Sequence, residues 1–108
     1  MSAPRDDSVF VDDIKSAIAR IQAYLHDVDE PAFQESTLLQ DAVVRQLEVI
    51  GEAAKRLSSS FREARPGIPW KDLIGMRAKL AHDYMTVDLQ IVWDTVQQDL
   101  PDLLAKLE

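Results

Sequence analysis

The chain has 108 residues, 46% of them hydrophobic, which fits one small domain (residues 1–108) with a core over about residues 8–107. Cysteine is absent and no apolar run is long enough for a membrane helix or a signal peptide. Disulfides and thiolate chemistry are therefore excluded, and we expect a cytoplasmic protein that makes no contact with membranes. The formal net charge of -7 argues against indiscriminate binding of nucleic acid.

The charge is unevenly distributed along the chain. Between Lys55 and Lys79 there are seven basic residues and two acidic ones, whereas the remainder is strongly acidic. Because exposed charges are screened beyond about 8 Å at physiological salt, this basic segment can bind a polyanion despite the acidic remainder. Solvated helix faces explain the same charges equally well.

Helical periodicity dominates the first half of the chain. Apolar residues recur at three- and four-residue steps from about Ser8 to Asp27 and from about Gln34 to Leu57, which predicts two amphipathic helices. Pro31 separates them, since proline lacks an amide donor and restricts the residue before it. Gly51 indicates close approach of another helix, or is simply tolerated inside the second helix.

Turn residues divide the second half. Ser58–Ser60 and Arg65–Pro69 interrupt the helical pattern, with a single turn expected over Phe61–Ala64. Pro69 suits the first position of a helix that leads into Trp70. Gly75 allows a bend before the segment Met76–Tyr84 begins or continues this helix.

The last helix is expected to start after Asp88, which is a suitable cap, and Pro101 should produce a kink or a restart near residues 98–100. No segment alternates with the period of a strand. The sequence therefore predicts an all-α protein, an antiparallel bundle of about four main helices, with Trp70 and Trp93 in its core.

The segment Ile74–Val87 combines the groups best suited to act on a phosphate, namely Arg77, His82 and Tyr84. Arginine can fork onto phosphate oxygens, histidine can transfer a proton near neutral pH, and the tyrosine hydroxyl can donate, accept or be modified. In a structural explanation, His82 is a surface histidine and Tyr84 a core aromatic. No second ligand accompanies His82 at helical spacing, so no metal and no cofactor are predicted.

Helical geometry limits how these residues can act together. On an ideal helix, position 82 is about 140° around from position 77, so one continuous helix cannot direct all three residues to one point. Either the helix ends near Ala81 and the chain turns back toward Arg77, or two copies form a shared groove across a two-fold dimer, which we favour. Near a helix C-terminus, His82 would be favoured in its protonated form and could act as a general acid.

The segment Arg77-Ala-Lys-Leu-Ala-His82-Asp-Tyr84 resembles the signature of HEPN domains, in which an arginine precedes a His-x-Tyr sequence. Three flanking blocks resemble the HepT-like branch of that family and occur in the same order; they are Ile50–Lys55, Ile68–Arg77 and Val87–Val96. The resemblance covers about residues 12–107, almost the whole chain.

This resemblance implies a homodimeric, metal-independent ribonuclease toxin of a toxin-antitoxin pair, with Arg77 and His82 as the catalytic residues. It also implies a partner, an MntA-like nucleotidyltransferase antitoxin that transfers AMP to Tyr84. RNA is the implied substrate, with transfer RNA as one candidate. The residues of the basic segment expected to bind RNA are Lys55, Arg56, Lys71 and Lys79.

Two other readings remain open from the sequence. Family members often have a polar residue directly after the arginine, where this chain has Ala78. If that polar group matters, the protein is instead a non-catalytic dimeric partner and modification substrate of the nucleotidyltransferase. A purely structural bundle leaves the clustered motif unexplained.

Overall fold

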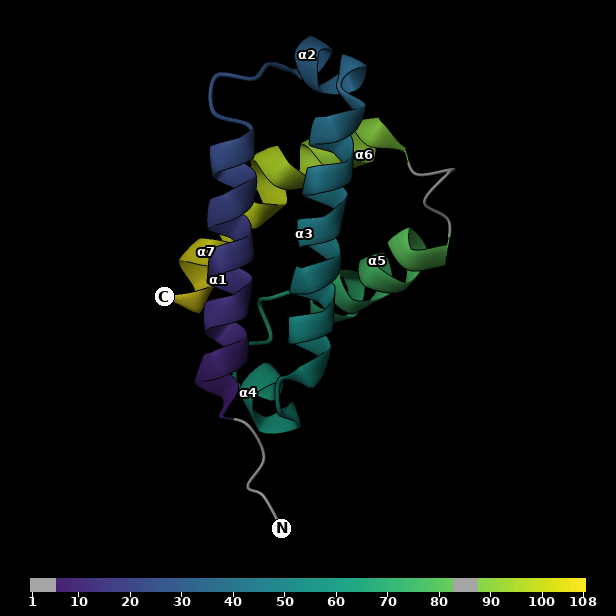
Figure 1. The fold of residues 1–108 in the computed structure, drawn as a ribbon. Coiled ribbons are helices and arrows are strands. Elements are labelled where there is room, and N and C mark those ends of the chain that lie inside the picture. Colours follow the sequence, from purple (N-terminus) through teal and green to yellow (C-terminus); the bar gives the residue numbers. More distant parts are fainter. Residues whose placement is uncertain (1–5, 83–87) are drawn as a thin grey trace.

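The computed structural model describes residues 6–82 and 88–108, and for residues 77–82 it describes the backbone without the side chains. All regular structure in these ranges is helical. Two long helices, α1 (Asp7–Tyr24) and α3 (Thr37–Arg56), lie side by side and run antiparallel (Figure 1). The short α2 (Glu30–Glu35) connects their upper ends, and α4 (Ser59–Glu63) follows α3 at the opposite end.

The remaining helices lie behind this pair. α5 (Trp70–His82) crosses and packs against α3. A last helical segment comprises α6 (Leu89–Asp94), a wider π-helical stretch η2 (Thr95–Asp99) and α7 (Leu100–Leu107). With α1, α3 and α5 it makes four main helical segments, so the predicted all-α bundle is confirmed.

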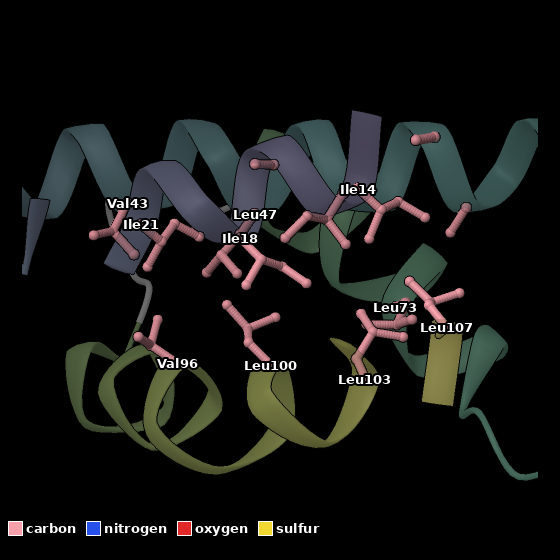
Figure 2. Packing of buried hydrophobic residues seen from close by; sticks show 14 of the residues in the cluster. Ile14, Ile18, Ile21, Val43, Leu47, Leu73, Val96, Leu100, Leu103 and Leu107 are labelled. Atoms are coloured by element: carbon pink, nitrogen blue, oxygen red, sulfur yellow. The ribbon is translucent and has the colours of Figure 1, made fainter. Parts of the chain in front are cut away.

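The core lies between the α1–α3 pair and the last helical segment. Figure 2 shows the apolar side chains of this segment directed toward those of α1 and α3. The stripes that helical periodicity predicted supply these side chains, which are almost completely buried. They include Ile14, Ile18, Ile21, Val43, Leu47, Val96, Leu100, Leu103 and Leu107.

The regular helix is interrupted before Pro101 by the π-helical stretch η2, and α7 restarts at Leu100, which is the restart rather than the kink of the two predicted alternatives. The amide of Leu100 donates to the carbonyl of Thr95, five residues earlier. Proline cannot donate and its ring clashes with the carbonyl four residues before it, so the helix widens ahead of Pro101 instead of continuing regularly. The hydroxyl of Thr95 also donates to the carbonyl of Ile91 at 2.8 Å.

The predicted bounds of the first two helices need correction. α1 ends at Tyr24 rather than Asp27, which adopts a left-handed conformation with φ 58°. The expected helix over Gln34–Leu57 is divided at Ser36, whose backbone is extended. Pro31 does not exclude helix either, because it occupies the first turn of α2, where its missing amide donor would have no intrahelical acceptor.

Other predictions for the second half are confirmed or corrected as follows. The turn around Phe61 is α4, and Asp88 caps α6 by accepting from the amides of Gln90 and Ile91. α5 continues through Gly75 without interruption. Trp70 and Trp93, which were predicted to lie in the core, are partly buried and pack against it.

No helix in the described ranges is both long and apolar enough to cross a membrane.

Candidate active site

The helix α5 carries the candidate site, and its first turn is held firmly in place. The amide of Trp70 donates to the carbonyl of Ile68 at 2.8 Å. The indole Nε1 donates to the carbonyls of Arg62 and Arg65, both at 3.1 Å. Leu73, one turn later, is buried in the core. Hydrogen bonds to α4 and the loop, together with apolar packing, therefore fix where α5 begins.

The structure places the backbone of both predicted catalytic residues, Arg77 and His82, on α5. His82 is the last residue of this helix that the structure describes, so the alternative in which the helix ends near Ala81 falls at the limit of the described residues. Five residues of regular helix correspond to about 140° around the helix axis, so the two positions face different directions on an ideal helix. Their side chains, and Tyr84 altogether, lie outside the described part of the structure.

The predicted RNA-binding residues occupy two separate elements. Lys55 and Arg56 are exposed in the last turn of α3, where Arg56 Nε is 3.1 Å from Glu52 Oε1. That ion pair makes Arg56 a weaker candidate than its charge suggests. Lys71 is exposed in the first turn of α5. Lys79 lies on the same helix, and its side chain is among those not described.

A groove between α4 and α5 gathers residues that the sequence did not bring together. This α4–α5 groove has a volume of about 400 Å³ and is lined by Ser59, Arg62, Glu63, Trp70, Lys71 and Ile74. The sequence indicates Arg62 only as one member of the basic segment, and it predicts Trp70 only as a core residue. The contact between α4 and α5 that makes them neighbours has no signature in the local sequence.

A second groove lies on the other side of α5, next to α6. It has a volume of about 270 Å³ and its lining includes two carboxylates, Asp72 and Asp88, besides Lys71. Gly75, Met76, Ile91 and Val92 complete its walls. The two sides of α5 therefore differ in charge: the side facing α4 is more basic than the side facing α6.

The position of α4 depends on a carboxylate from the start of α1. Asp7 accepts hydrogen bonds from the backbone amide and the hydroxyl of Ser58, at 2.8 and 2.6 Å. These two bonds, and the nearby positive charge of Arg65, hold the pKa of Asp7 below its usual value of 3.8. Ser58 in turn caps α4 by accepting from the amide of Phe61 at 3.1 Å.

The side chains in the described ranges form no cluster of three or more histidine, aspartate or glutamate residues that could hold a metal ion.

Comparison with known proteins assigns the bundle and its motif-bearing helix to the HEPN class of helical domains. The family model described as "Ribonuclease HepT-like" matches residues 14–108. The chain belongs to this HepT-like ribonuclease family, which confirms the resemblance seen in the sequence.

Several relatives support the assignment over nearly the whole chain. The "Probable ribonuclease HepT" of Thermococcus cleftensis is 38% identical over 99 residues, which is 92% of this chain and 90% of the relative. A "Putative RNase" of Methanocaldococcus jannaschii is 40% identical over 104 residues, 96% of this chain and 90% of the relative. No solved structure shows significant similarity to the chain.

Another relative from Methanocaldococcus jannaschii is named "Gamma-glutamylcyclotransferase and putative RNase". It is 41% identical over 103 residues, which cover 95% of this chain but only 46% of that protein. Sequences of this family therefore occur both as short chains and as part of longer ones.

Proposed function

We propose that the protein is a ribonuclease toxin that cleaves RNA without a metal ion, with Arg77 and His82 as its catalytic residues. The observation that carries this proposal is the family match over residues 14–108, which includes both residues.

The proposed chemistry uses a nucleophile that RNA itself supplies. The 2′-hydroxyl attacks the adjacent phosphorus while His82 transfers protons, and the bond to the 5′-oxygen of the next nucleotide breaks. Arg77 stabilises the charge that develops on the phosphorane oxygens. The products are a 2′,3′-cyclic phosphate and a 5′-hydroxyl, and no water or metal-bound hydroxide is required for this step.

A two-fold homodimer is part of the proposal. The separation of about 140° between positions 77 and 82 on one regular helix makes it difficult for a single chain to direct both residues at one phosphate. In a dimer, Arg77 of one chain can act with His82 of the other. Light scattering on the purified protein would measure twice the chain mass, and a monomer that cleaves RNA at full rate would contradict this part.

Regulation is proposed to act through Tyr84. An MntA-like nucleotidyltransferase antitoxin would let the tyrosine oxygen attack the α-phosphate of ATP, so that AMP is transferred and pyrophosphate leaves. The added phosphodiester brings bulk and negative charge beside the site and repels RNA. The acidic part of the surface outside the basic segment suits docking to a basic partner.

The first test is cleavage of total cellular RNA, with transfer RNA analysed separately, by the partner-free protein in excess EDTA. We expect cyclic phosphate ends, and a loss of about a hundredfold or more in rate for both Arg77→Ala and His82→Ala. The chain provides matched controls in His26→Ala and Arg45→Ala, since both of these side chains are exposed and lie outside α5. Unchanged cleavage by the Arg77 and His82 variants would contradict the catalytic assignment.

The second candidate function is a non-catalytic, dimeric binding partner and modification substrate of the nucleotidyltransferase. Ala78 favours it, because many family members have a polar residue directly after the motif arginine. Under this alternative, the unmodified protein leaves RNA intact while Tyr84 still accepts AMP.

A further inference from the structure

We propose that the α4–α5 groove binds the single-stranded segment of RNA next to the phosphate that is cleaved. Arg62 and Lys71 would contact phosphates, and the indole of Trp70 would stack on a base. This inference rests on the proposed ribonuclease function and adds to it a binding subsite formed by residues outside the motif.

The charge of the α4–α5 groove suits a polyanion. Arg62 and Lys71 contribute to its lining and form no ion pair with a carboxylate in the described ranges. The Nε of Arg62 is buried without an acceptor, so packing rather than an ion pair holds this side chain against the wall. Glu63 is the acidic member of the lining, and Arg65 lies just beyond it, stacked over the ring of Phe61 at 3.8 Å. Among the charged residues that line the groove, the two cations Arg62 and Lys71 therefore outnumber the single carboxylate of Glu63.

The aromatic part of the groove suits a base rather than a phosphate. Both hydrogen bonds of the Trp70 Nε1 go to backbone carbonyls, at Arg62 and Arg65, so the polar edge of the indole is already satisfied. Phe61 packs edge-on against the indole at a centroid distance of 6.2 Å and further limits its movement. Proteins that bind single-stranded RNA stack its bases on aromatic side chains and contact its phosphates with basic residues. The α4–α5 groove offers both, a rigid and partly exposed indole beside cations that form no ion pair with any described residue.

The groove also lies on the appropriate sector of α5. At 100° per residue, position 74 is about 60° around the helix axis from position 77, on the side toward position 82. Ile74 lines the α4–α5 groove. Lys71 is six residues before Arg77, or about 9 Å along the helix axis. A strand of a few nucleotides can therefore extend from the groove to a phosphate bound at position 77.

The opposite side of α5 is a poorer path for RNA. Its groove contains the carboxylates of Asp72 and Asp88, which repel phosphates. Lys71 contributes to both grooves, so the difference comes from the other residues: Arg62 and Trp70 on one side, two acids on the other. RNA bound along α5 is thus directed toward α4.

The experiment measures binding of a short, unstructured, fluorescein-labelled oligoribonucleotide by the full chain carrying His82→Ala, which prevents cleavage. Log affinity falls linearly with log salt, and each phosphate contact to a single strand contributes about 0.7 to the steepness of that line. The double variant Arg62→Gln, Lys71→Gln should therefore reduce the steepness by about 1.4. Affinity at 0.1 M salt should fall by about tenfold or more. The control, Arg20→Gln with Arg45→Gln, removes the same charge from exposed positions of α1 and α3 and should change neither value.

Stacking has its own measurement. In a Trp93→Phe chain, the remaining tryptophan fluorescence comes from Trp70, and RNA should quench it. An RNA duplex of the same length should quench it less, because its bases are not free to stack.

The outcomes separate the two proposals. If the unmodified protein cleaves RNA but the groove variants match the control in affinity and salt dependence, or Trp70 is not quenched, the groove proposal fails and the ribonuclease proposal stands. If the unmodified protein neither binds nor cleaves RNA, both fail. Urea unfolding of each variant verifies that a loss of binding is not a loss of fold.

Discussion

At the scale of single residues, Asp7 joins two segments that are distant in sequence. It accepts two hydrogen bonds from Ser58, 51 positions away, and so ties the start of α1 to the start of α4. Because α4 forms one wall of the α4–α5 groove, this exposed carboxylate affects the shape of the proposed RNA-binding surface as well as the stability of the fold.

The contribution of Asp7 to stability should depend on pH. Its pKa in the folded protein is lower than the ordinary value of 3.8, chiefly because of the hydrogen bonds from Ser58. The stabilisation is therefore complete above about pH 4 and is lost as the pH falls through the folded pKa. Asp7→Ala should lower the urea midpoint at neutral pH, and the difference from wild type should shrink as the pH falls below about 4. Asp12→Ala, an exposed carboxylate on the same helix, is the control; a difference for Asp7→Ala that stays constant with pH would contradict the linkage.

The proposed roles of Tyr84 can be separated by removing its hydroxyl. Tyr84→Phe keeps the ring but has no oxygen to attack ATP, so the variant should cleave RNA yet accept no AMP. In the presence of the nucleotidyltransferase and ATP, wild-type cleavage should decline while that of the variant persists. Mass spectrometry would measure the added AMP, with Tyr24→Phe as the matched control. Continued modification of Tyr84→Phe would place the acceptor elsewhere.

At the scale of elements, the break at Ser36 shows where periodicity is insufficient. Apolar residues recur at helical spacing on both sides of Ser36. Phe33 of α2 is buried, and so is the apolar stripe of α3. The Ser36 hydroxyl accepts from the amide of Leu39 at 3.1 Å, while Gln40 Nε2 donates to the carbonyls of Phe33 and Gln34, both at 3.0 Å. Side chains thus satisfy the backbone groups that a continuous helix would have paired, and two helices result.

Removal of this cap should weaken the start of α3. Ser36→Ala leaves the amide of Leu39 without its acceptor and should lower the free energy of unfolding by about 1 kcal/mol. Ser36→Asp should restore most of the loss, because its carboxylate accepts the same hydrogen bond. The control is Ser16→Ala, at an exposed position in the middle of α1, where alanine has the higher helix propensity. Urea unfolding would decide; equal stability of the two alanine variants would contradict the role of the cap.

The sequence predicts those features that local pattern determines. Spacing and residue type predict the amphipathic stripes, the cap at Asp88 and the interruption of the helix before Pro101. The α4–α5 groove does not, because it depends on how a five-residue helix packs against a helix that begins seven residues after it ends. The position of Trp70 at the edge of the core depends on the same packing, as its indole hydrogen bonds show.

At the scale of the whole molecule, the residues that contribute most to stability and those proposed to bind RNA lie in different parts of the fold. The buried core lies between the α1–α3 pair and the last helical segment (Figure 2). α5 is held mainly by α3, and its grooves face solvent on either side. Residues of the core layer can therefore change stability while leaving the grooves along α5 intact.

Leu100 tests this separation. It is 2% exposed and directed toward α1 and α3 immediately after the π-helical stretch, so Leu100→Ala should lower the free energy of unfolding by about 2–5 kcal/mol. Leu38 is 79% exposed, and Leu38→Ala should change the free energy of unfolding by less than about 0.5 kcal/mol. Urea unfolding measures both.

Below its lowered midpoint, the Leu100→Ala protein should bind the oligoribonucleotide with wild-type affinity and salt dependence, because α5 packs mainly against α3. If the fully folded variant instead binds RNA more weakly, the core layer also determines the shape of the α4–α5 groove. The proposed separation of the two layers would then be wrong.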